Sequence, residues 1–492
     1  MSGQAVRKVV IAGGGTAGWC AAAALSKLLG PLLDITLVES EEIGIVGVGE
    51  ATIPTCRTFH HLLGIDEREF LRATNGTFKL AIAFEDWARK GDRYIHSFGE
   101  MGKSSWMAPF HHLWLQARAE GVAGPIGEYG FEYQAAEAGK FQTGENARIN
   151  YAYHFDAGLY GRFLRGISEK AGVKRVEGRI ETVAQDPESG FITELVLQSG
   201  ERIAGDLFID CTGFHGLLIE KTLKTGYEDW SRWLPTNRAV AVQTESHGAL
   251  TPYTRAAAHD AGWRWRIPLQ NRVGNGLVYC SDYLSDDAAR DRLLSLVDAP
   301  ALIEPRLIRY QTGRRLKSWN RNCVTLGLSS GFIEPLESTS IHLFQIGVTR
   351  LIQLFPLAGI TDALVDHYNA LSRNELEKVR DFVILHYALN EREEPFWRDR
   401  RGMTLPDTLI ERIALFTESG IAYQAPDDLF RVDSWVQVML GQRLEPKRWH
   451  PVGQMMGRDQ MAAALGNLKG GIARAVAGMP THEDFIRQYC AV

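Results

Sequence analysis

Two stretches of this sequence carry residue types whose spacing suits chemistry. The first is the glycine-rich run Gly13–Gly18, which Glu39 follows at a distance of about 20 residues. Glycines allow a tight turn and a close backbone approach to a pyrophosphate, a helix start offers N–H groups, and the carboxylate accepts from ribose hydroxyls. We therefore predict a dinucleotide site, rather than a structural glycine turn, with contacts from Gly13, Gly15, Thr16, Ala17, Gly18 and Glu39.

The second stretch is Gly331–Leu343, which reads GFIEPLESTSIHL. Pro335 suits the first turn of a helix, and the N–H groups of Thr339 and Ser340 near a helix start make a site for a small anion such as a halide. The alternative is that the two glutamates of the stretch only complement the helix dipole and that a serine or threonine only caps the helix. The residues by themselves leave both interpretations open.

The elements around the glycine run form a βαβ unit, because two short strands rich in β-branched residues flank an alanine-rich helix. Two later segments return to the same domain. One is a strand that ends in a turn, and the other is a strand that leads into an amphipathic helix. The expected bounds are strands at 9–12 and 35–38, a helix at 16–29, a strand and turn at 206–213, a strand at 323–328 and a helix from about 337 to 354.

A dinucleotide domain built from separated pieces favours an FAD fold over a contiguous NAD domain. We predict an α/β protein in which an FAD-binding, Rossmann-like domain with the GxGxxG turn is interleaved with a substrate-binding domain, followed by a mainly helical C-terminal region. The expected modules are a flavin module at 1–110, 150–235 and 310–390, a substrate-side module at 111–149 and 236–309, and the helical C-terminal region at 391–492.

A loop with three glycines, Gly44–Pro54, comes directly after the nucleotide-binding unit. A loop without bulky side chains can lie against a cofactor, and a plain connection is the alternative. We expect cofactor contacts from Gly47, Val48, Gly49, Glu50 and Ala51.

The composition limits the classes of partner. The 492 residues are 45% hydrophobic and 23% charged, with a formal net charge of −5, so the sequence offers no basic field for nucleic acid. Six scattered cysteines form no C-x-x-C pair, which predicts reduced thiols, no metal site and a cytoplasmic protein. The apolar run after Arg7 and Lys8 is not interpreted as a signal peptide, since glycines interrupt it, and we expect no membrane segment. A small-molecule substrate is the better expectation, and a homodimer is one assembly that the sequence allows.

Several motifs coincide in one family. The stretch Glu334–Ile341 resembles the EPLESTGI element of the flavin-dependent tryptophan (indole) halogenases, Trp263–Pro268 fills their WxWxIP motif, and Asn75–Lys79 resembles the segment that bears their catalytic lysine. The opening GxGxxG, followed by Trp19, and the glycine loop match as well. The resemblance extends from Val9 to about Trp397, and the combination is far more specific than any single motif.

The resemblance implies a reaction in two parts. FADH2, delivered by a separate NADH-dependent flavin reductase, reacts with oxygen, and a chloride or bromide ion attacks the resulting hydroperoxide to give a hypohalous acid. That acid migrates to the substrate chamber, where Lys79 holds it by a hydrogen bond or forms a haloamine with it. Glu337 positions the oxidant, or stabilises the cationic intermediate and helps to remove its proton.

Other residues are assigned by the same resemblance. His96 and Phe98 match, by spacing, residues that line the indole pocket, and core packing is the alternative for both. Trp263 and Trp265 shape the wall between flavin and substrate, and they also fit a half-buried strand with Trp inward and Arg outward. Leu328 and Ile341 are expected on the cofactor side.

Two departures from the family pattern affect the substrate and the halide. Ser340 replaces a glycine, so its side chain narrows the expected halide site. After Trp397 the sequence lacks the aromatic-rich, acidic lid that closes over tryptophan in tryptophan-specific relatives. We therefore expect indole, a substituted indole or a larger aromatic at least as much as free tryptophan.

Two other classes compete with this interpretation. A flavin-dependent aromatic monooxygenase would transfer oxygen directly and would need neither Lys79 nor a halide site. A non-catalytic flavin-binding protein would need neither Lys79 nor Glu337.

Overall fold

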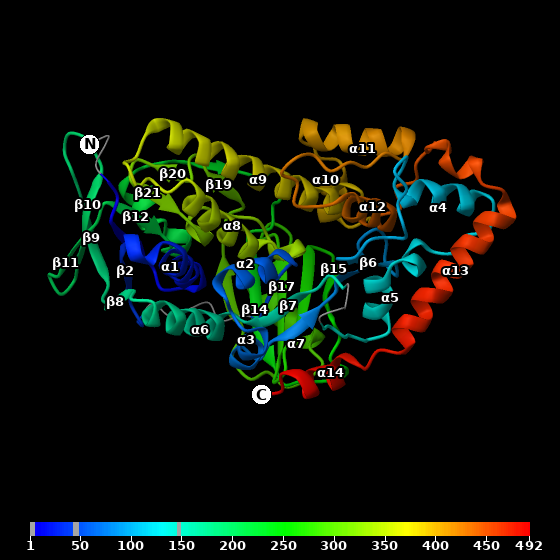
Figure 1. Cartoon of the computed structure of the whole chain (residues 1–492), viewed down its shortest axis with the longest axis horizontal. Coiled ribbons are helices and arrows are strands. Elements are labelled where there is room, and N and C mark those ends of the chain that lie inside the picture. Colours follow the sequence, from blue (N-terminus) through cyan, green and yellow to red (C-terminus); the bar gives the residue numbers. More distant parts are fainter. Residues whose placement is uncertain (1–4, 43–48, 145–148) are drawn as a thin grey trace. The chain divides into compact units, whose positions relative to one another are not determined.

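The computed structural model describes residues 5–42, 49–144 and 149–492, which fall into two compact units (Figure 1). The first unit comprises residues 1–76, 155–235 and 310–377, and the second comprises residues 77–154, 236–309 and 378–492. Each unit is thus assembled from segments that are far apart in the sequence.

A six-stranded sheet forms the centre of the first unit, in the order β20-β21-β12-β1-β2-β8. All neighbouring strands are parallel except the pair β20 and β21. The β-branched residues of β1 and β2 are buried, as parallel strands covered on both faces require. The strands are β1 (Lys8–Ala12), β2 (Asp34–Glu39), β8 (Lys174–Glu177), β12 (Leu207–Asp210), β20 (Trp319–Asn320) and β21 (Cys323–Thr325).

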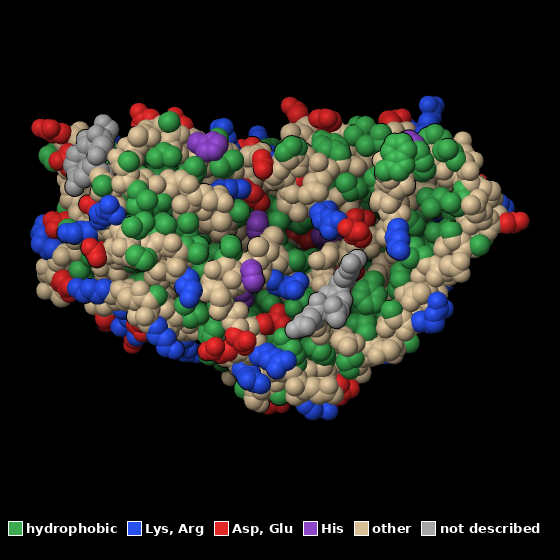
Figure 2. Space-filling model, in the orientation of Figure 1, with side chains coloured by type: hydrophobic (Ala, Val, Ile, Leu, Met, Phe, Trp, Pro, Cys, Tyr) green, Lys and Arg blue, Asp and Glu red, His purple; other side chains and the backbone are tan. Residues whose placement is uncertain are grey.

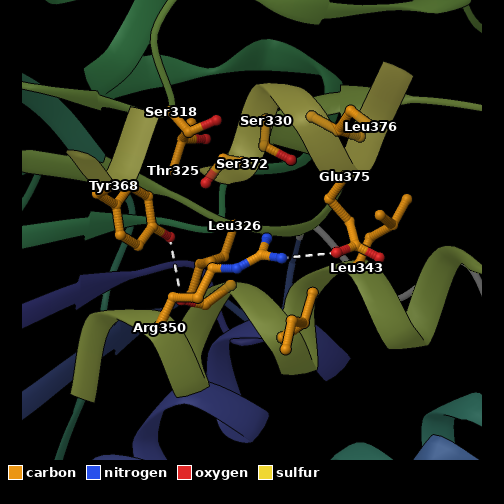
Figure 3. Close-up of a pocket in the computed structure, with 12 residues that line it drawn as sticks. Ser318, Thr325, Leu326, Ser330, Leu343, Arg350, Tyr368, Ser372, Glu375 and Leu376 are labelled. Atoms are coloured by element: carbon orange, nitrogen blue, oxygen red, sulfur yellow. Dashed lines mark hydrogen bonds and ion pairs between the residues drawn. The ribbon is translucent and has the colours of Figure 1, made fainter. Parts of the chain in front are cut away.

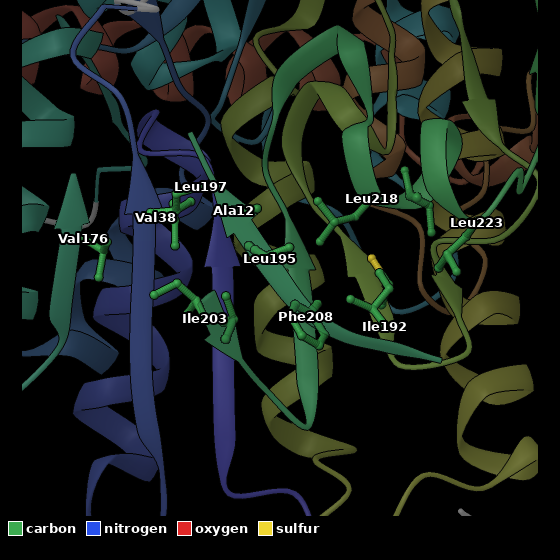
Figure 4. Packing of buried hydrophobic residues seen from close by; sticks show 13 residues of the cluster. Ala12, Val38, Val176, Ile192, Leu195, Leu197, Ile203, Phe208, Leu218 and Leu223 are labelled. Carbon is green, nitrogen blue, oxygen red and sulfur yellow. The ribbon is translucent and has the colours of Figure 1, made fainter. Parts of the chain in front are cut away.

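A small antiparallel meander covers one face of this sheet. Its strands β9 (Ile180–Gln185), β10 (Ile192–Leu197) and β11 (Arg202–Ala204) supply Leu195, Leu197 and Ile203, which pack against Val10, Ala12, Val38 and Phe208 (Figure 4). The alanine-rich helix α1 (Thr16–Leu29) contacts β1 and β2 and packs against α6 (Ala157–Lys170) and α8 (Ser340–Gln353).

The first unit also contains a three-stranded sheet and several short elements. They are β3 (Gly49–Ala51), α2 (Thr55–Leu63), α3 (Glu67–Ala73), β13 (Tyr227–Asp229), β19 (Gly313–Arg315), β22 (Gly331–Phe332) and the start of α9 (Asp362–Ala388). The order in the small sheet is β13-β19-β22.

A seven-stranded sheet organises the second unit, in the order β18-β14-β17-β16-β15-β5-β6. Only β15 and β5 run parallel. The strands are β5 (Ala81–Glu85), β6 (Arg93–Ser97), β14 (Arg238–Thr244), β15 (Tyr253–His259), β16 (Gly262–Pro268), β17 (Val273–Tyr279) and β18 (Arg306–Arg309). The short strand β4 (Thr77–Lys79) pairs separately with β7 (Ala152–Asp156).

The helices of the second unit include the expected C-terminal series. They are α4 (Phe110–Ala119), α5 (Phe131–Glu137), α7 (Asp286–Leu296), α10 (Pro395–Arg401), α11 (Asp407–Ser419), α12 (Val432–Gly441), α13 (Arg458–Ala477) and α14 (His482–Tyr489). Within the described ranges, no helix combines the length and apolar character needed to cross a bilayer. On the face drawn in Figure 2, basic and acidic side chains are interspersed, in keeping with the small net charge.

The expected mixed α/β class and the βαβ unit are confirmed, and the helix at 16–29 has the predicted bounds. Two predicted elements are wrong in extent. The strand expected at 323–328 ends at Thr325, because Gly327 takes a left-handed conformation with φ of 69° and begins a 3₁₀ turn. The helix expected from 337 begins at Ser340, because Ser338 has φ of 59° and separates a 3₁₀ turn at 335–337 from α8.

Candidate active site

The glycine turn after β1 has the geometry of a dinucleotide site. Gly13 has φ of 107°, and a Cβ atom there would lie 2.3 Å from the carbonyl oxygen of Cys211. A Cβ atom on Gly18 would lie 1.9 Å from the carbonyl oxygen of Gly13. In contrast, a Cβ atom on Gly15 would have no protein atom within 4 Å. The first and last glycines therefore allow the turn to pack, whereas Gly15 leaves open space at the uncapped start of α1, which fits a bound phosphate group.

Glu39 lies at the end of β2 and already has partners. Its Oε1 atom accepts from Nε of Arg175 and lies 3.5 Å from Nη1 of Arg165, and its Oε2 atom accepts from the indole N–H of Trp19 at 3.3 Å. A carboxylate offers about four lone-pair positions, so these bonds leave capacity for a ribose hydroxyl. Sequence reasoning did not single out Gly14, yet a Cβ atom there would lie 1.6 Å from Oε2 of Glu39.

Other predicted cofactor residues lie around the start of α1. Thr16 Oγ1 donates to the carbonyl oxygen of Ala157 at 3.2 Å. Leu328 lies in the 3₁₀ turn Gly327–Ser329, where a Cβ atom on Gly327 would lie 2.7 Å from Cβ of Ala17. Ile341 is buried in α8, which packs against α1.

The glycine loop is described only in its last part. Gly49 and Ala51 are buried in β3, and Glu50 between them is half-buried. Burial raises the pKa of Glu50 to about 7. Gly47 and Val48 lie outside the described residues.

The start of α8 collects buried polar groups. Glu334, Glu337 and Thr339 are fully buried, and Ser340 is half-buried. Thr339 is the N-cap residue but its hydroxyl makes no capping bond, and Oγ1 has no hydrogen-bond partner among the described residues. Both glutamates precede the helix instead of lying in its first turn. Thr339 therefore does not cap α8 through its side chain.

A buried charged network holds α8 against α9 (Figure 3). Arg350 Nη2 donates to Oε2 of Glu375 at 2.6 Å, and His342 Nε2 lies 3.1 Å from Oε1 of the same carboxylate. The other ring nitrogen of His342 lies 2.9 Å from Oγ1 of Thr55 at the start of α2. The hydrogen bonds and charges of His342 and Arg350 lower the pKa of Glu375 against the effect of burial. This network fixes the first turn of α8, where Ser340 lies.

Lys79 is the last residue of β4 and is fully buried in the second unit. Lysine is rarely buried to this extent, so the usual surface position does not apply here. The Nζ atom lies 5.1 Å from the ring centre of Phe98, whose backbone N–H donates to the carbonyl oxygen of Leu80 at 3.0 Å. The structure thus brings together Lys79 and Phe98, which were predicted from separate motifs.

The two tryptophans of the WxWxIP motif lie on one face of β16. Trp263 and Trp265 are buried with ring centres 6.1 Å apart, while the arginines between and after them are half-buried, so the predicted alternation is confirmed. Trp265 pairs with Gly276, where a Cβ atom would lie 2.0 Å from the indole ring. The Trp263 ring centre lies 6.4 Å from that of Trp87, in an aromatic core.

His96 is also buried, and the ring contacts described for it are with Phe382 at 5.6 Å and Phe430 at 6.3 Å between centres. Phe382 and Phe430 stack on each other at 3.7 Å. Phe98 is half-buried beside Lys79. The environment of His96 is thus aromatic, which suits both the pocket and the core-packing interpretations.

Sequence reasoning missed two histidines beside the Lys79 strand. His154 on β7 lies opposite Thr77 in the register of the two strands, and His482 on α14 accepts from the backbone N–H of Phe78 at 3.1 Å. Burial, the charge of Lys79 and His482 hold the pKa of His154 well below its ordinary value. No local signal marks either residue, since their partners lie far away in the sequence.

Comparison with known proteins agrees with this arrangement. A sequence profile described as tryptophan halogenase matches residues 8–458. The tryptophan 6-halogenase SttH of Streptomyces toxytricini is 39% identical over 436 residues, which are 82% of this chain and 83% of that protein.

Solved structures give the same result over nearly the whole chain. Xcc4156, a flavin-dependent halogenase from Xanthomonas campestris, is 53% identical with a TM-score of 0.98, and the match covers 99% of each chain. BrvH, a flavin-dependent halogenase from Brevundimonas sp. BAL3, is 43% identical with a TM-score of 0.94, again over 99% of each chain. These relatives are halogenases and not monooxygenases. The chain therefore belongs to the tryptophan halogenase family and is a flavin-dependent halogenase.

Proposed function

We propose that this halogenase transfers chlorine or bromine to an indole or a related aromatic and does not depend on the amino-acid part of tryptophan. The absence of the acidic, aromatic-rich lid after Trp397 in the sequence supports this substrate class. Among the solved structures, identity is also higher to the flavin-dependent halogenases Xcc4156 and BrvH, at 53% and 43%, than to the tryptophan 6-halogenase SttH, at 33%.

The complete burial of Lys79 is the observation that carries its proposed role. A buried ammonium is desolvated, and its charge acts on a nearby oxidant with little screening by water. In this proposal the ammonium group of Lys79 donates a hydrogen bond to a hypohalous acid. In its amine form, Nζ bonds to the halogen while the oxygen–halogen bond breaks, and the hydroxide leaves as water with a proton from the amine. The face of Phe98, whose ring centre lies 5.1 Å from Nζ, supports the charged form through a cation–π contact.

Glu337 is the proposed base. Its carboxyl group is fully buried at the turn before α8, so it interacts with a cationic ring more strongly than a solvated carboxylate would. It stabilises the positive charge that develops on the aromatic ring and accepts the proton that the halogen replaces.

The residues around the glycine turn are proposed to hold FAD. Reduced FAD, when bound there, would supply the electrons with which oxygen and a halide ion give the hypohalous acid. The first-turn N–H groups of α1 and the open space at Gly15 receive the pyrophosphate, while Glu39 accepts from the ribose. Leu328 and Ile341 contribute apolar surface on the same side.

We propose that the halide lies at the N–H groups of Thr339 and Ser340. First-turn N–H groups have no intrahelical acceptor and carry the positive end of the helix dipole. The buried Thr339 hydroxyl, which has no hydrogen-bond partner in the described part of the chain, is a third donor at the same place.

A single experiment tests the function. The protein is incubated with FAD, NADH, bromide or chloride and a panel that contains indole, substituted indoles and tryptophan, with and without a flavin reductase, and the products are identified by mass. We expect halogenated indoles only when the reductase is present, because one nucleotide fingerprint is visible in the sequence. Each of three results would contradict part of the proposal: hydroxylated products without halogen, halogenation of tryptophan but of no other indole in the panel, or rapid NADH oxidation without the reductase.

A further inference from the structure

A chain of buried hydrogen bonds connects the Lys79 strand with the end of the WxWxIP strand. Thr77 Oγ1 lies 2.8 Å from the carbonyl oxygen of Pro268 and 3.1 Å from Nδ1 of His154. His154 Nε2 lies 2.9 Å from Oγ1 of Thr254. The side chains of Thr77, His154 and Thr254 are all buried, and those of Thr77 and His154 are fully buried. We call Thr77, His154 and Thr254 the Thr77 network.

The direction of these hydrogen bonds follows from the number of protons. A carbonyl oxygen only accepts, so the single hydroxyl proton of Thr77 goes to Pro268. Thr77 must then accept from His154, which places a proton on Nδ1 of the imidazole. In the neutral ring, Nε2 accepts from the hydroxyl of Thr254. Every proton of the network is thus used once, and the ring is held in one tautomer.

Thr77 of this network and Lys79 belong to the same short strand, β4. Thr77 and Lys79 are two residues apart on β4, so their side chains share one face, and Thr77 lies opposite His154 in the antiparallel pairing with β7. The other edge of β4 is held by His482, which accepts from the N–H of Phe78. His482 in turn donates from Nδ1 to the carbonyl oxygen of Leu250 at 2.8 Å. The three-residue strand β4 therefore has β7 on one edge and His482 on the other, and Lys79 is its charged residue.

We propose that His154 is a positioning residue for Lys79, which it places by tying Thr77 to the carbonyl oxygen of Pro268 and so fixing β4 against the Trp263–Pro268 strand. The proposal rests on the proposed function of Lys79. It explains why Asn-Gly-Thr-Phe-Lys has a threonine two residues before the lysine. Asn75, with φ of 51°, lies in the turn before β4, and Thr77 supplies the link to Pro268.

Variants of His154 distinguish a role in positioning Lys79 from a role in packing the protein core. In His154→Asn the side-chain amide nitrogen takes the place of Nδ1 and can donate to Thr77, whereas His154→Gln reaches Thr254 but not Thr77, and His154→Phe reaches neither. The measured quantity is the amount of halogenated indole formed per reduced flavin consumed, together with hypohalous acid trapped in solution. We expect His154→Phe and His154→Gln to lose about 100-fold in halogenated product and to release trapped oxidant, since displacing a catalytic group by about 1 Å has an effect of this order. His154→Asn should recover most of the product.

A second pair covers the case in which His154→Phe does not fold. Thr77→Val keeps the shape of the side chain but removes the hydroxyl, and Thr77→Ser keeps the hydroxyl. Thr77→Val should behave as His154→Phe does, and Thr77→Ser should behave as the parent. His111→Phe is the matched control, because His111 is a buried histidine of the same unit whose ring nitrogen bonds to the carbonyl oxygen of Gly420 on a different part of the chain. It should lower the Tm without lowering the product per flavin.

The outcomes distinguish the two proposals. Normal product per flavin in folded Thr77→Val or His154→Phe would overturn the role of His154. The role would also be overturned if His154→Asn and His154→Phe lost the same amount of product per flavin, and if this loss followed the decrease in Tm as it does in His111→Phe. If Lys79→Met retained halogenation, the proposed role of Lys79 would fail and this inference with it, whereas loss in Lys79→Met with a normal His154→Phe would overturn only the inference.

Discussion

Replacement of Lys79 by methionine is the most informative perturbation of the proposed mechanism. The side chain is fully buried, so truncation to alanine would leave a cavity and cost about 2–5 kcal/mol of stability by itself. Methionine keeps most of the volume and removes the charge, so a change in activity reports on chemistry. We expect FAD binding and flavin reoxidation to stay within about twofold of the parent, because the glycine turn that fits FAD belongs to a different compact unit from Lys79.

The size of the loss distinguishes two roles for the lysine. A charge-assisted hydrogen bond contributes about 1.5–3 kcal/mol, which corresponds to roughly 10- to 150-fold in rate. If Lys79 also carries the halogen as a haloamine, the loss should exceed about a thousandfold, or about 4 kcal/mol. Lys79→Arg keeps the charge and the donors but stays protonated, so it should retain activity only in the hydrogen-bonding case.

The assay measures flavin reoxidation by absorbance and halogenated product by mass in single-turnover reactions. An independent readout is the imidazole of His154, whose pKa is lowered first by burial and then by the charge of Lys79. In Lys79→Met that pKa should rise part of the way towards its ordinary value, which NMR titration of the folded protein would follow. Halogenation at the parent rate, or loss of flavin reoxidation together with product, would refute the proposed role.

Three further predictions concern the cofactor turn, the halide and acid stability. Gly15→Ala should fold normally but bind FAD more weakly, whereas Gly18→Ala should lower the Tm as well, because only the second Cβ atom meets protein within 4 Å; unchanged FAD affinity in a fluorescence titration of Gly15→Ala would place the pyrophosphate elsewhere. Ser340→Gly should raise the ratio of brominated to chlorinated product in mixed halide, because it widens the proposed site for the larger ion; an unchanged ratio with intact halide dependence would exclude this site. Burial lowers the pKa of His60 to about 3 from an ordinary value of 6.5, so below pH 6.5 the unfolded chain binds the proton and the folded chain does not. The free energy of unfolding should therefore fall on acidification towards pH 3, with about 1.4 kcal/mol per pH unit from this residue, and urea unfolding of His60→Phe at pH 5, 6 and 7 should show a shallower slope than the parent; an identical slope would contradict the lowered pKa.

Local sequence was sufficient where local geometry decides the structure. The bounds of α1 were predicted because glycine is a poor helix former and alanine a good one, so the helix begins after Gly15 and continues through the alanine-rich run. The inward Trp263 and Trp265 were predicted because a strand alternates with a period of two. The predicted start of α8 was wrong because Ser338 adopts a left-handed conformation. Serine rarely does so, and local propensity does not reveal it.

Long-range partners could not be predicted in the same way. Sequence reasoning placed Glu39 near a ribose, and Arg175 and Trp19, which hold its carboxylate, come from β8 and α1. Lys79 would be assigned to the surface on residue type alone, and only the resemblance to a family pointed to its role. Its burial depends on β7, α14 and Phe98, which sequence periodicity does not bring to β4.

The segment before α8 combines features that a simple helix start does not need. Ser338 has a positive φ, which costs roughly 1 kcal/mol or more for a residue with a Cβ atom. Glu337 is buried, and the Thr339 hydroxyl is buried with no hydrogen-bond partner among the described residues, although burial of such groups opposes folding. The rest of the unit compensates for these costs, in part through the ion pair of Arg350 with Glu375 that holds α8 in place. Unfavourable terms that are concentrated in three consecutive residues, and supported by a dedicated network, are what a site selected for chemistry is expected to show.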